Sequence, residues 1–169
     1  MEQYPIQDHL EAYLDIETTG LSMEYCDITV IGIYIVGEST NKCVQLVGDE
    51  VTAENLLQAL EGVDVIYTYN GSRFDLPFIA RSLGVNLKET CDHRDLMFDC
   101  HKNNYRGGLK KVEQELGIER KLKDINGYEA VRLWWKYVND YDASALSILM
   151  RYNREDVVNL KQLKEILLV

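Results

Sequence analysis

Two carboxylates, Asp15 and Glu17, lie two residues apart in a short apolar stretch of this 169-residue chain. Alternate side chains of a β-strand share a face, so a strand here places both carboxylates on one side and Leu14 and Ile16 on the other. At a separation of about 4 Å and an effective dielectric near 20, the two charges repel by roughly 4 kcal/mol, so the pair needs a cation or a shared proton. Hard oxygen ligands favour magnesium or manganese over zinc. The competing interpretation is a solvated Asp-x-Glu alternation on an edge strand.

The turn that follows, residues 18–20, strengthens the metal interpretation. We expect it to offer exposed backbone N–H groups and a glycine free to adopt positive φ directly beside the carboxylates. Such a turn can hold a hydroxyl or phosphate oxygen.

Composition and charge limit the classes of protein that fit the chain. It is 46% hydrophobic and 27% charged, which predicts one globular domain over residues 1–169. No apolar run approaches the roughly 20 residues that span a bilayer, and residues 1–5 lack a leader pattern, so we expect no membrane association and a cytoplasmic protein. The net charge of -10 argues against a protein that coats nucleic acid through a basic surface, but it does not exclude a nuclease.

The four cysteines form no Cys-x-x-Cys pair, so we expect reduced, partly buried thiols. Residues 91–101 gather cysteine, histidine and aspartate side chains, but their spacing matches no zinc pattern. The apolar residues 96–98 in their middle indicate a strand or a helix start that crosses the core.

The surrounding elements predict an α/β layer structure. A strand over residues 27–36 and a shorter one over residues 42–47 form an antiparallel meander with the first strand, and residues 63–69 form a buried strand with at least one parallel pairing. Helices are expected over the following ranges: from Thr52 to about Leu60, up to Leu83, from about 106 to 117, over 128–138, and from Asp142 onward.

Several side chains have both a functional and a purely structural interpretation. Phe74 and Asp75 open a helix after a strand end, where α/β sheets place their sites, but they also suit a core contact and a helix start. Lys110, within the cations of residues 106–111, is a phosphate-binding candidate or part of a solvated helix start. The aromatic helix over 128–138 is expected to be a packing surface more than a base-stacking platform.

The last helix carries Tyr152 and Asp156 one turn apart, and therefore on one face. Glu155 points elsewhere on that helix, and we expect it to be solvated.

Three segments, residues 15–21 (DIETTGL), 70–75 (NGSRFD) and 152–156 (YNRED), together resemble the three motifs of the DEDD superfamily of 3′-to-5′ exonucleases. The Tyr-x-x-x-Asp spacing of the third looks like the tyrosine subclass. Residues 117–120 and 124–128 further resemble ribonuclease-H-like predicted exonuclease domains. Each motif is weak alone, but three in order form a strong signal.

The resemblance implies a ribonuclease-H-like fold, with a mixed five-stranded sheet flanked by helices and two Mg²⁺ or Mn²⁺ ions at the strand ends. By position, Asp15 would bridge both ions, Glu17 and Asp156 would complete one metal site, and Asp75 would support the other. Tyr152 would orient the attacking water, because a phenol with a pKa near 10 is a poor base at neutral pH. The metal would lower the pKa of that water, and hydrolysis would release nucleoside 5′-monophosphates.

The resemblance also implies a groove for 3′ ends of single-stranded DNA or RNA. The Thr18 backbone and Glu17 would receive the terminal 3′-hydroxyl, Leu21 would wedge against the end bases, and Asn70 and Phe74 would line the groove. Apolar wedges and aromatic faces suit strands of any sequence, because every base can stack.

Two rival interpretations remain at this stage. A haloacid-dehalogenase-type phosphatase also begins with a strand-end aspartate, but its second acid is an aspartate where this chain has Glu17, and Tyr152 and Asp156 would go unused. A non-catalytic ribonuclease-H-like binding or structural module of a larger assembly is the other alternative. A protein partner or a fused module could then supply the missing positive surface.

Overall fold

A computed structural model describes residues 9–169, and the strand that carries the two carboxylates is the middle strand of its sheet. β1 (Leu10–Thr18) pairs antiparallel with β2 (Ile28–Val36), which pairs antiparallel with β3 (Asn41–Val47). On its other side β1 pairs parallel with β4 (Val63–Thr68), and β4 pairs parallel with β5 (Asp92–Asp95). The strand order β3-β2-β1-β4-β5 confirms the predicted mixed five-stranded sheet.

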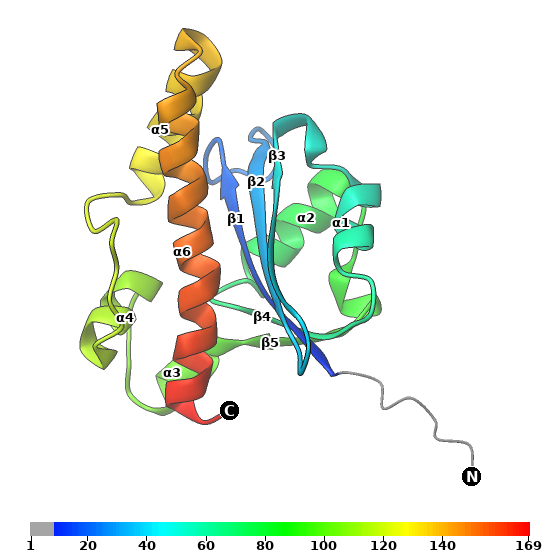
Figure 1. Cartoon of the computed structure of the whole chain (residues 1–169), viewed down its shortest axis with the longest axis vertical. Helices are drawn as coiled ribbons and strands as arrows, with labels where there is room; N and C mark the ends of the chain where they lie inside the picture. Colours follow the sequence, from blue (N-terminus) through cyan, green and yellow to red (C-terminus); the bar gives the residue numbers. More distant parts are fainter. Residues whose placement is uncertain (1–8) are drawn as a thin grey trace.

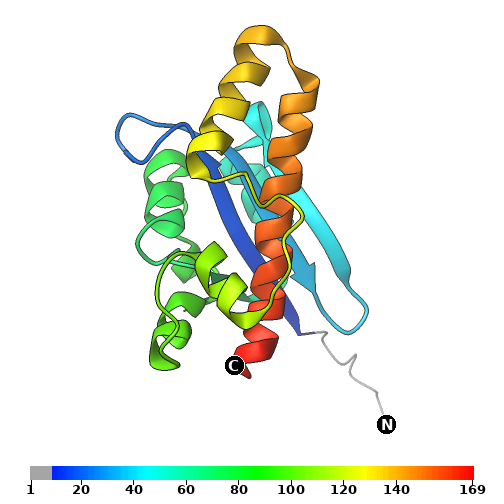
Figure 2. The same ribbon diagram turned by 90° about the vertical axis from the view of Figure 1, so that its left-hand side faces the viewer.

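Both faces of the sheet are covered by helices (Figure 1). α1 (Ala53–Ala59) and α2 (Asp75–Leu83) lie on one face. The long α6 (Ala143–Leu167) crosses the other face, together with α3 (Leu96–Lys102) and α4 (Leu109–Leu116). α5 (Gly127–Asp140) runs beside the first half of α6 and, with it, projects beyond the sheet (Figure 2).

The alternation of β1 divides its side chains between two hydrophobic clusters. Ala12, Leu14 and Ile16 pack into the cluster that contains the apolar residues of α1 and α2. Tyr13 packs on the opposite face with apolar residues of α3, α4 and α6. Asp15 and Glu17 are alternate residues to Tyr13 along β1, so their side chains point to the same face, which α6 covers.

The helix ends follow the predicted signals. The Thr52 and Asp142 side chains accept hydrogen bonds from the N–H groups of residues three positions later and begin α1 and α6. Gly84 and Gly117 end α2 and α4 with φ of 69° and 74°, a left-handed conformation that favours glycine. Short 3₁₀ turns at Gly48–Glu50 and Leu87–Glu89 complete the connections.

The helix start predicted at residues 96–98 is confirmed, because α3 begins at Leu96 with Leu96 and Met97 buried, but the strand before it, β5, was not predicted. The strand is made of the polar residues Asp92–Asp95, and α3 starts directly after it, with the Asp95 carboxylate accepting the N–H of Met97 at 3.1 Å. Cys100 is buried in the core, and the four cysteines are free, as predicted.

Two predictions concern the chain ends and membranes. The leader-free interpretation of residues 1–5 lies outside the described part of the chain. Within residues 9–169, no helix combines the length and the apolar character that a bilayer crossing requires.

Candidate active site

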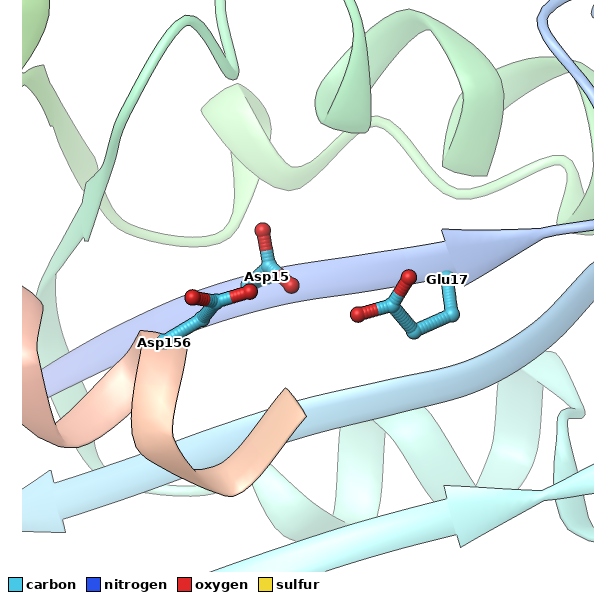
Figure 3. Close-up of side chains that lie close together, drawn as sticks. All are labelled: Asp15, Glu17 and Asp156. Atoms are coloured by element: carbon cyan, nitrogen blue, oxygen red, sulfur yellow. The ribbon is translucent and has the colours of Figure 1, made fainter. Parts of the chain in front are cut away.

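Three carboxylates from two elements converge on the α6 face of the sheet. Asp15 and Glu17 project from β1, and Asp156 reaches them from the middle of α6 (Figure 3). One oxygen atom from each of the three side chains lies within 4.8 Å of the other two. Glu17 and Asp156 are buried and Asp15 is partly buried, so water screens their mutual repulsion poorly.

The fourth acidic residue, Asp75, lies next to this acidic triad but is not part of it. Asp75 is the first residue of α2, and its Oδ1 accepts the backbone N–H of Ile16 at 3.1 Å. The side chain therefore ties the start of α2 to the strand position between the two β1 carboxylates. The structure brings all four predicted acidic residues to one region, three of them within the reach of a single ion.

The electrostatics of these acids disfavour negative charge in the absence of a cation. Burial raises the pKa of Asp15 to about 7, although the Asn153 amide and the Arg120 guanidinium act in the opposite direction. Burial, and then the charges of Asp15 and Asp75, raise the pKa of Glu17 well above its usual range. Burial and the Asp15 charge do the same to the pKa of Asp75.

The donor set fits a hard divalent cation. Glu17 Oε1 is buried and has no hydrogen-bond partner, which is costly for a carboxylate unless a cation or proton neutralises it. Carboxylate oxygens alone are the ligands that suit magnesium and manganese, whereas zinc sites use histidine and cysteine. The triad therefore offers what such an ion requires, and an ion would relieve the repulsion within it.

Arg120 is a site residue that the sequence analysis did not identify. Its guanidinium is buried between α4 and α6, where Nη1 donates to Glu113 Oε2 at 3.1 Å and Nη2 donates to Asp156 Oδ1. Glu155 Oε2 lies 3.8 Å from Arg120 Nε. The only feature of the sequence that could have indicated this role is that Arg120 belongs to residues 117–120, one of the segments with a family resemblance.

Asn153 is a second residue that was missed. Its Nδ2 donates to Asp15 Oδ2 at 3.1 Å, and its Oδ1 accepts from Gln45 Nε2 at 2.9 Å. A Cβ atom at Gly32, on the neighbouring strand, would overlap this side-chain amide. Asn153 thus links β3 to Asp15 and fixes the orientation of that carboxylate; its adjacency to Tyr152 was the available signal.

Tyr152 lies next to the triad, and two cations lie near its ring. Lys110 Nζ is 5.1 Å and Arg120 Cζ is 5.4 Å from the ring centroid. Burial raises the pKa of Tyr152, and the charges of Glu17 and Asp15 raise it further. The phenol therefore keeps its proton at neutral pH and can donate a hydrogen bond, as the predicted orienting role requires.

Two adjoining cavities meet at the triad. The larger, of about 600 Å³, is lined by the acids and by the predicted groove residues Thr18, Leu21, Asn70 and Phe74. The smaller, of about 450 Å³, is lined by Lys110 and Arg120 and shares Asp15 and Asp156 with the first. The predicted substrate-binding residues thus surround one continuous hollow, with apolar groups on one side of the acids and cations on the other.

Two local predictions were wrong. The Thr19 N–H donates to the Asp27 carbonyl oxygen at 2.9 Å, and Gly20 has no positive φ; it is needed because a Cβ there would lie 2.8 Å from Cys26 Sγ. Glu155 is not solvated, because its carboxylate accepts the backbone N–H groups of Lys121 and Leu122.

The prediction of α5 as a packing surface is confirmed, because Ala130, Leu133 and Trp134 of α5 share a cluster with Leu149 and Tyr152 of α6. Trp134 packs against the sheet, but Trp135 and Val138 are exposed. Tyr128, 74% exposed, lines the larger cavity together with Val131. The start of α5 therefore also forms part of the site wall.

The cysteine, histidine and aspartate side chains of residues 91–101 serve other contacts. Asp95 accepts the N–H groups of Asn70 at 2.8 Å and of Ser72 at 3.0 Å, which fixes the loop that leads into α2. Asp99 pairs with Arg94 through two hydrogen bonds of 2.9 and 3.0 Å.

Comparison with known families gives one match. The model of the RNase H superfamily matches residues 12–168, which is nearly the whole chain. A comparison with curated proteins gives no match.

Solved structures share the fold at low sequence identity. The family B DNA polymerase of the archaeon Pyrobaculum calidifontis is 19% identical, with a TM-score of 0.74 over 99% of this chain and 25% of the polymerase. This chain thus spans about a quarter of that protein. NrnC of Brucella melitensis bound to pGG is 22% identical, with a TM-score of 0.62 over 93% of this chain and 71% of NrnC. NrnC with bound Mg²⁺ gives a TM-score of 0.50 at 20% identity, over 93% and 83% of the two chains.

Proposed function

The chain belongs to the RNase H superfamily, and on that premise we propose that it is a divalent-metal-dependent 3′-to-5′ exonuclease of the DEDD type. Its substrates are 3′ ends of single-stranded DNA or RNA, and its products are nucleoside 5′-monophosphates. The observation that carries the proposal is the acidic triad of Asp15, Glu17 and Asp156, which lies where an apolar cavity meets a cationic one.

The proposed metal centre consists of two Mg²⁺ or Mn²⁺ ions held by the triad, with Asp75 in support. Bound ions would supply Lewis acidity, which lowers the pKa of a water and stabilises the charge on a leaving oxygen. The unpartnered Glu17 Oε1 and the raised pKa of Asp15 support this role, because both make a cation favourable there. The related fold of NrnC, solved with Mg²⁺, supports the choice of ion.

The substrate assignment is supported by the walls of the larger cavity. Leu21 is 85% exposed at its rim, and Phe74 and Tyr128 add aromatic surface, so a terminal base can stack there irrespective of its sequence. The Thr18 backbone and Glu17 receive the 3′-hydroxyl in this proposal, and Asn70 lines the path of the backbone. NrnC with bound pGG supports an oligonucleotide as the occupant.

Tyr152 positions the reacting water in the proposed reaction. Its raised pKa keeps the hydroxyl protonated, so the tyrosine holds the water by hydrogen bonding and does not act as a general base. Lys110, on the cationic side, holds a phosphate of the strand.

The test is the polarity and chemistry of cleavage. Single-stranded DNA and RNA labelled at the 5′ end, incubated with manganese, should shorten one nucleotide at a time from the 3′ end, and mass spectrometry should detect nucleoside 5′-monophosphates. Asp156→Asn should produce neither. Internal cuts, shortening from the 5′ end or full activity in a chelator would refute the proposal. Binding of the strand without any cleavage would favour the non-catalytic module instead.

A further inference from the structure

Arg120 is a buried cation held at two points of the site. Its side chain is 6% exposed, and Glu113 binds Nη1 while Asp156 binds Nη2. Glu113 is itself fixed, because its Oε1 accepts from Asn159 Nδ2 at 3.0 Å. Glu113, together with Glu155 Oε2 at 3.8 Å from Arg120 Nε, therefore holds the guanidinium independently of Asp156.

The contact between Arg120 and Asp156 competes with a metal ion. A divalent cation at the triad attracts the Asp156 carboxylate and repels the guanidinium beside it. Arg120 Nη2 would then lose its acceptor in a buried position, and Nε already has no hydrogen-bond partner. A buried guanidinium with missing acceptors is unfavourable. Metal binding at the triad therefore favours the binding of a new anion to Arg120.

The smaller cavity can supply the place for that anion. Arg120 and Lys110 line it, and Asp15 and Asp156 lie at its boundary with the triad. Both cations also contact the ring of Tyr152. A phosphate suits this arrangement, because the planar guanidinium fork binds two phosphate oxygens at once and Lys110 adds a second positive charge.

We propose that Arg120 is a ligand for the substrate phosphate, held on Asp156 in the metal-free protein, so that the divalent ion and the phosphate bind with positive coupling. The inference rests on the proposed function, since it concerns the same metal centre. Coupling is reciprocal, so each ligand raises the affinity for the other by the same factor. Arg120 thereby restrains metal binding until a phosphate is present.

The experiment measures Mn²⁺ affinity of the full chain by calorimetry, alone, with saturating adenosine 5′-monophosphate, and with adenosine as the control that lacks the phosphate. The monophosphate should raise Mn²⁺ affinity at least about tenfold in the wild type, and adenosine should not. In Arg120→Gln, Mn²⁺ affinity without nucleotide should equal or exceed that of the wild type, because Asp156 is released. The coupling factor should fall at least about fivefold.

Arg94→Gln is the matched control. Arg94 also pairs with a buried carboxylate, that of Asp99, but lies outside the two cavities of the site. This variant should keep the wild-type affinity and coupling. Arg120→Lys retains the charge without the planar guanidinium and should also lose most of the coupling. This variant replaces Arg120→Gln in the test if Arg120→Gln does not fold.

Three results would overturn the inference. The first is wild-type coupling in both Arg120 variants, and the second is reduced Mn²⁺ affinity in Arg120→Gln with coupling intact, which indicates a purely structural role. The third is equal Mn²⁺ affinity with and without the monophosphate in the wild type. The proposed function fails in a different way: Asp15→Asn would then bind Mn²⁺ as the wild type does.

Discussion

Replacing Asp15 with asparagine removes one charge from the acidic triad and leaves its shape nearly unchanged. Asn153 Nδ2 donates to Asp15 Oδ2 at 3.1 Å, and an asparagine at this position still offers an oxygen acceptor. The variant therefore isolates the cost of charge in the metal-free protein. We expect Asp15→Asn to be more stable than the wild type when no metal is present.

The magnitude follows from the pKa of Asp15, raised by burial from 3.8 to about 7. Each pKa unit corresponds to about 1.4 kcal/mol, so three units give about 4 kcal/mol between the two protonation states. Glu17 and Asp75 ionise more readily once position 15 is neutral, and this reduces the gain to about half, or about 2 kcal/mol. For a chain of this length that is about 4 to 8 °C in Tm.

The sign of the pH dependence is fixed by the direction of the shift. The folded-state pKa of Asp15 lies above its unfolded value, so its stabilising contribution is complete below about pH 4 and is lost as the pH rises through about 7. The advantage of Asp15→Asn should therefore be smallest at pH 4.5 and largest at pH 8.

The assay is thermal unfolding in chelator from pH 4.5 to 8.5. Asp49→Asn, which removes the same charge from an exposed side chain in the first 3₁₀ turn, is the control for the loss of one negative charge. A difference between wild type and Asp15→Asn that stays constant over this range, or that favours the wild type at pH 8, would refute the electrostatic account.

Three further predictions concern the loaded site. Manganese at about one hundred times its Kd should raise the wild-type Tm by roughly 5 to 11 °C in a thermal scan, and Asp15→Asn should lose most of that rise. Tyr152→Phe should lower kcat by up to about 100-fold, a milder loss than Asp156→Asn, because it removes a positioning hydroxyl but no metal charge; equal losses in rate assays would contradict this. Asn153→Ala should weaken manganese binding by about 10- to 100-fold in titrations, because Asp15 loses its orienting hydrogen bond; an unchanged Kd would argue against that role.

The sequence predicted those features whose causes are local. The alternation in β1 correctly separated Asp15 and Glu17 from Leu14 and Ile16, because strand geometry alone decides which side chains share a face. Capping and glycine signals located the starts of α1 and α6 and the ends of α2 and α4, since they depend on neighbouring backbone groups, but α4 starts at Leu109 and not near residue 106 as predicted. The family resemblance supplied the number of strands and the mixed character of the sheet, which local patterns do not determine.

The features that were missed depend on contacts between distant parts of the chain. Asn153 lies 138 residues from Asp15, and Arg120 lies 36 residues from Asp156, so no local pattern marks either contact. β5 is too polar to be recognised as a strand from its sequence. It is a strand because its backbone pairs in parallel with the edge of β4. Glu155 was expected in solvent. In the structure its carboxylate accepts hydrogen bonds from Lys121 and Leu122, which are distant in the sequence, so no local pattern could show this role.

The most direct test of the proposed metal centre is the position of manganese in crystals of the loaded protein, measured by anomalous scattering. We predict that the strongest anomalous peak lies among the carboxylates of Asp15, Glu17 and Asp156, and that it is absent in Asp15→Asn crystals treated in the same way. A strongest peak elsewhere, or an identical peak in the variant, would contradict the assignment of this triad as the metal centre.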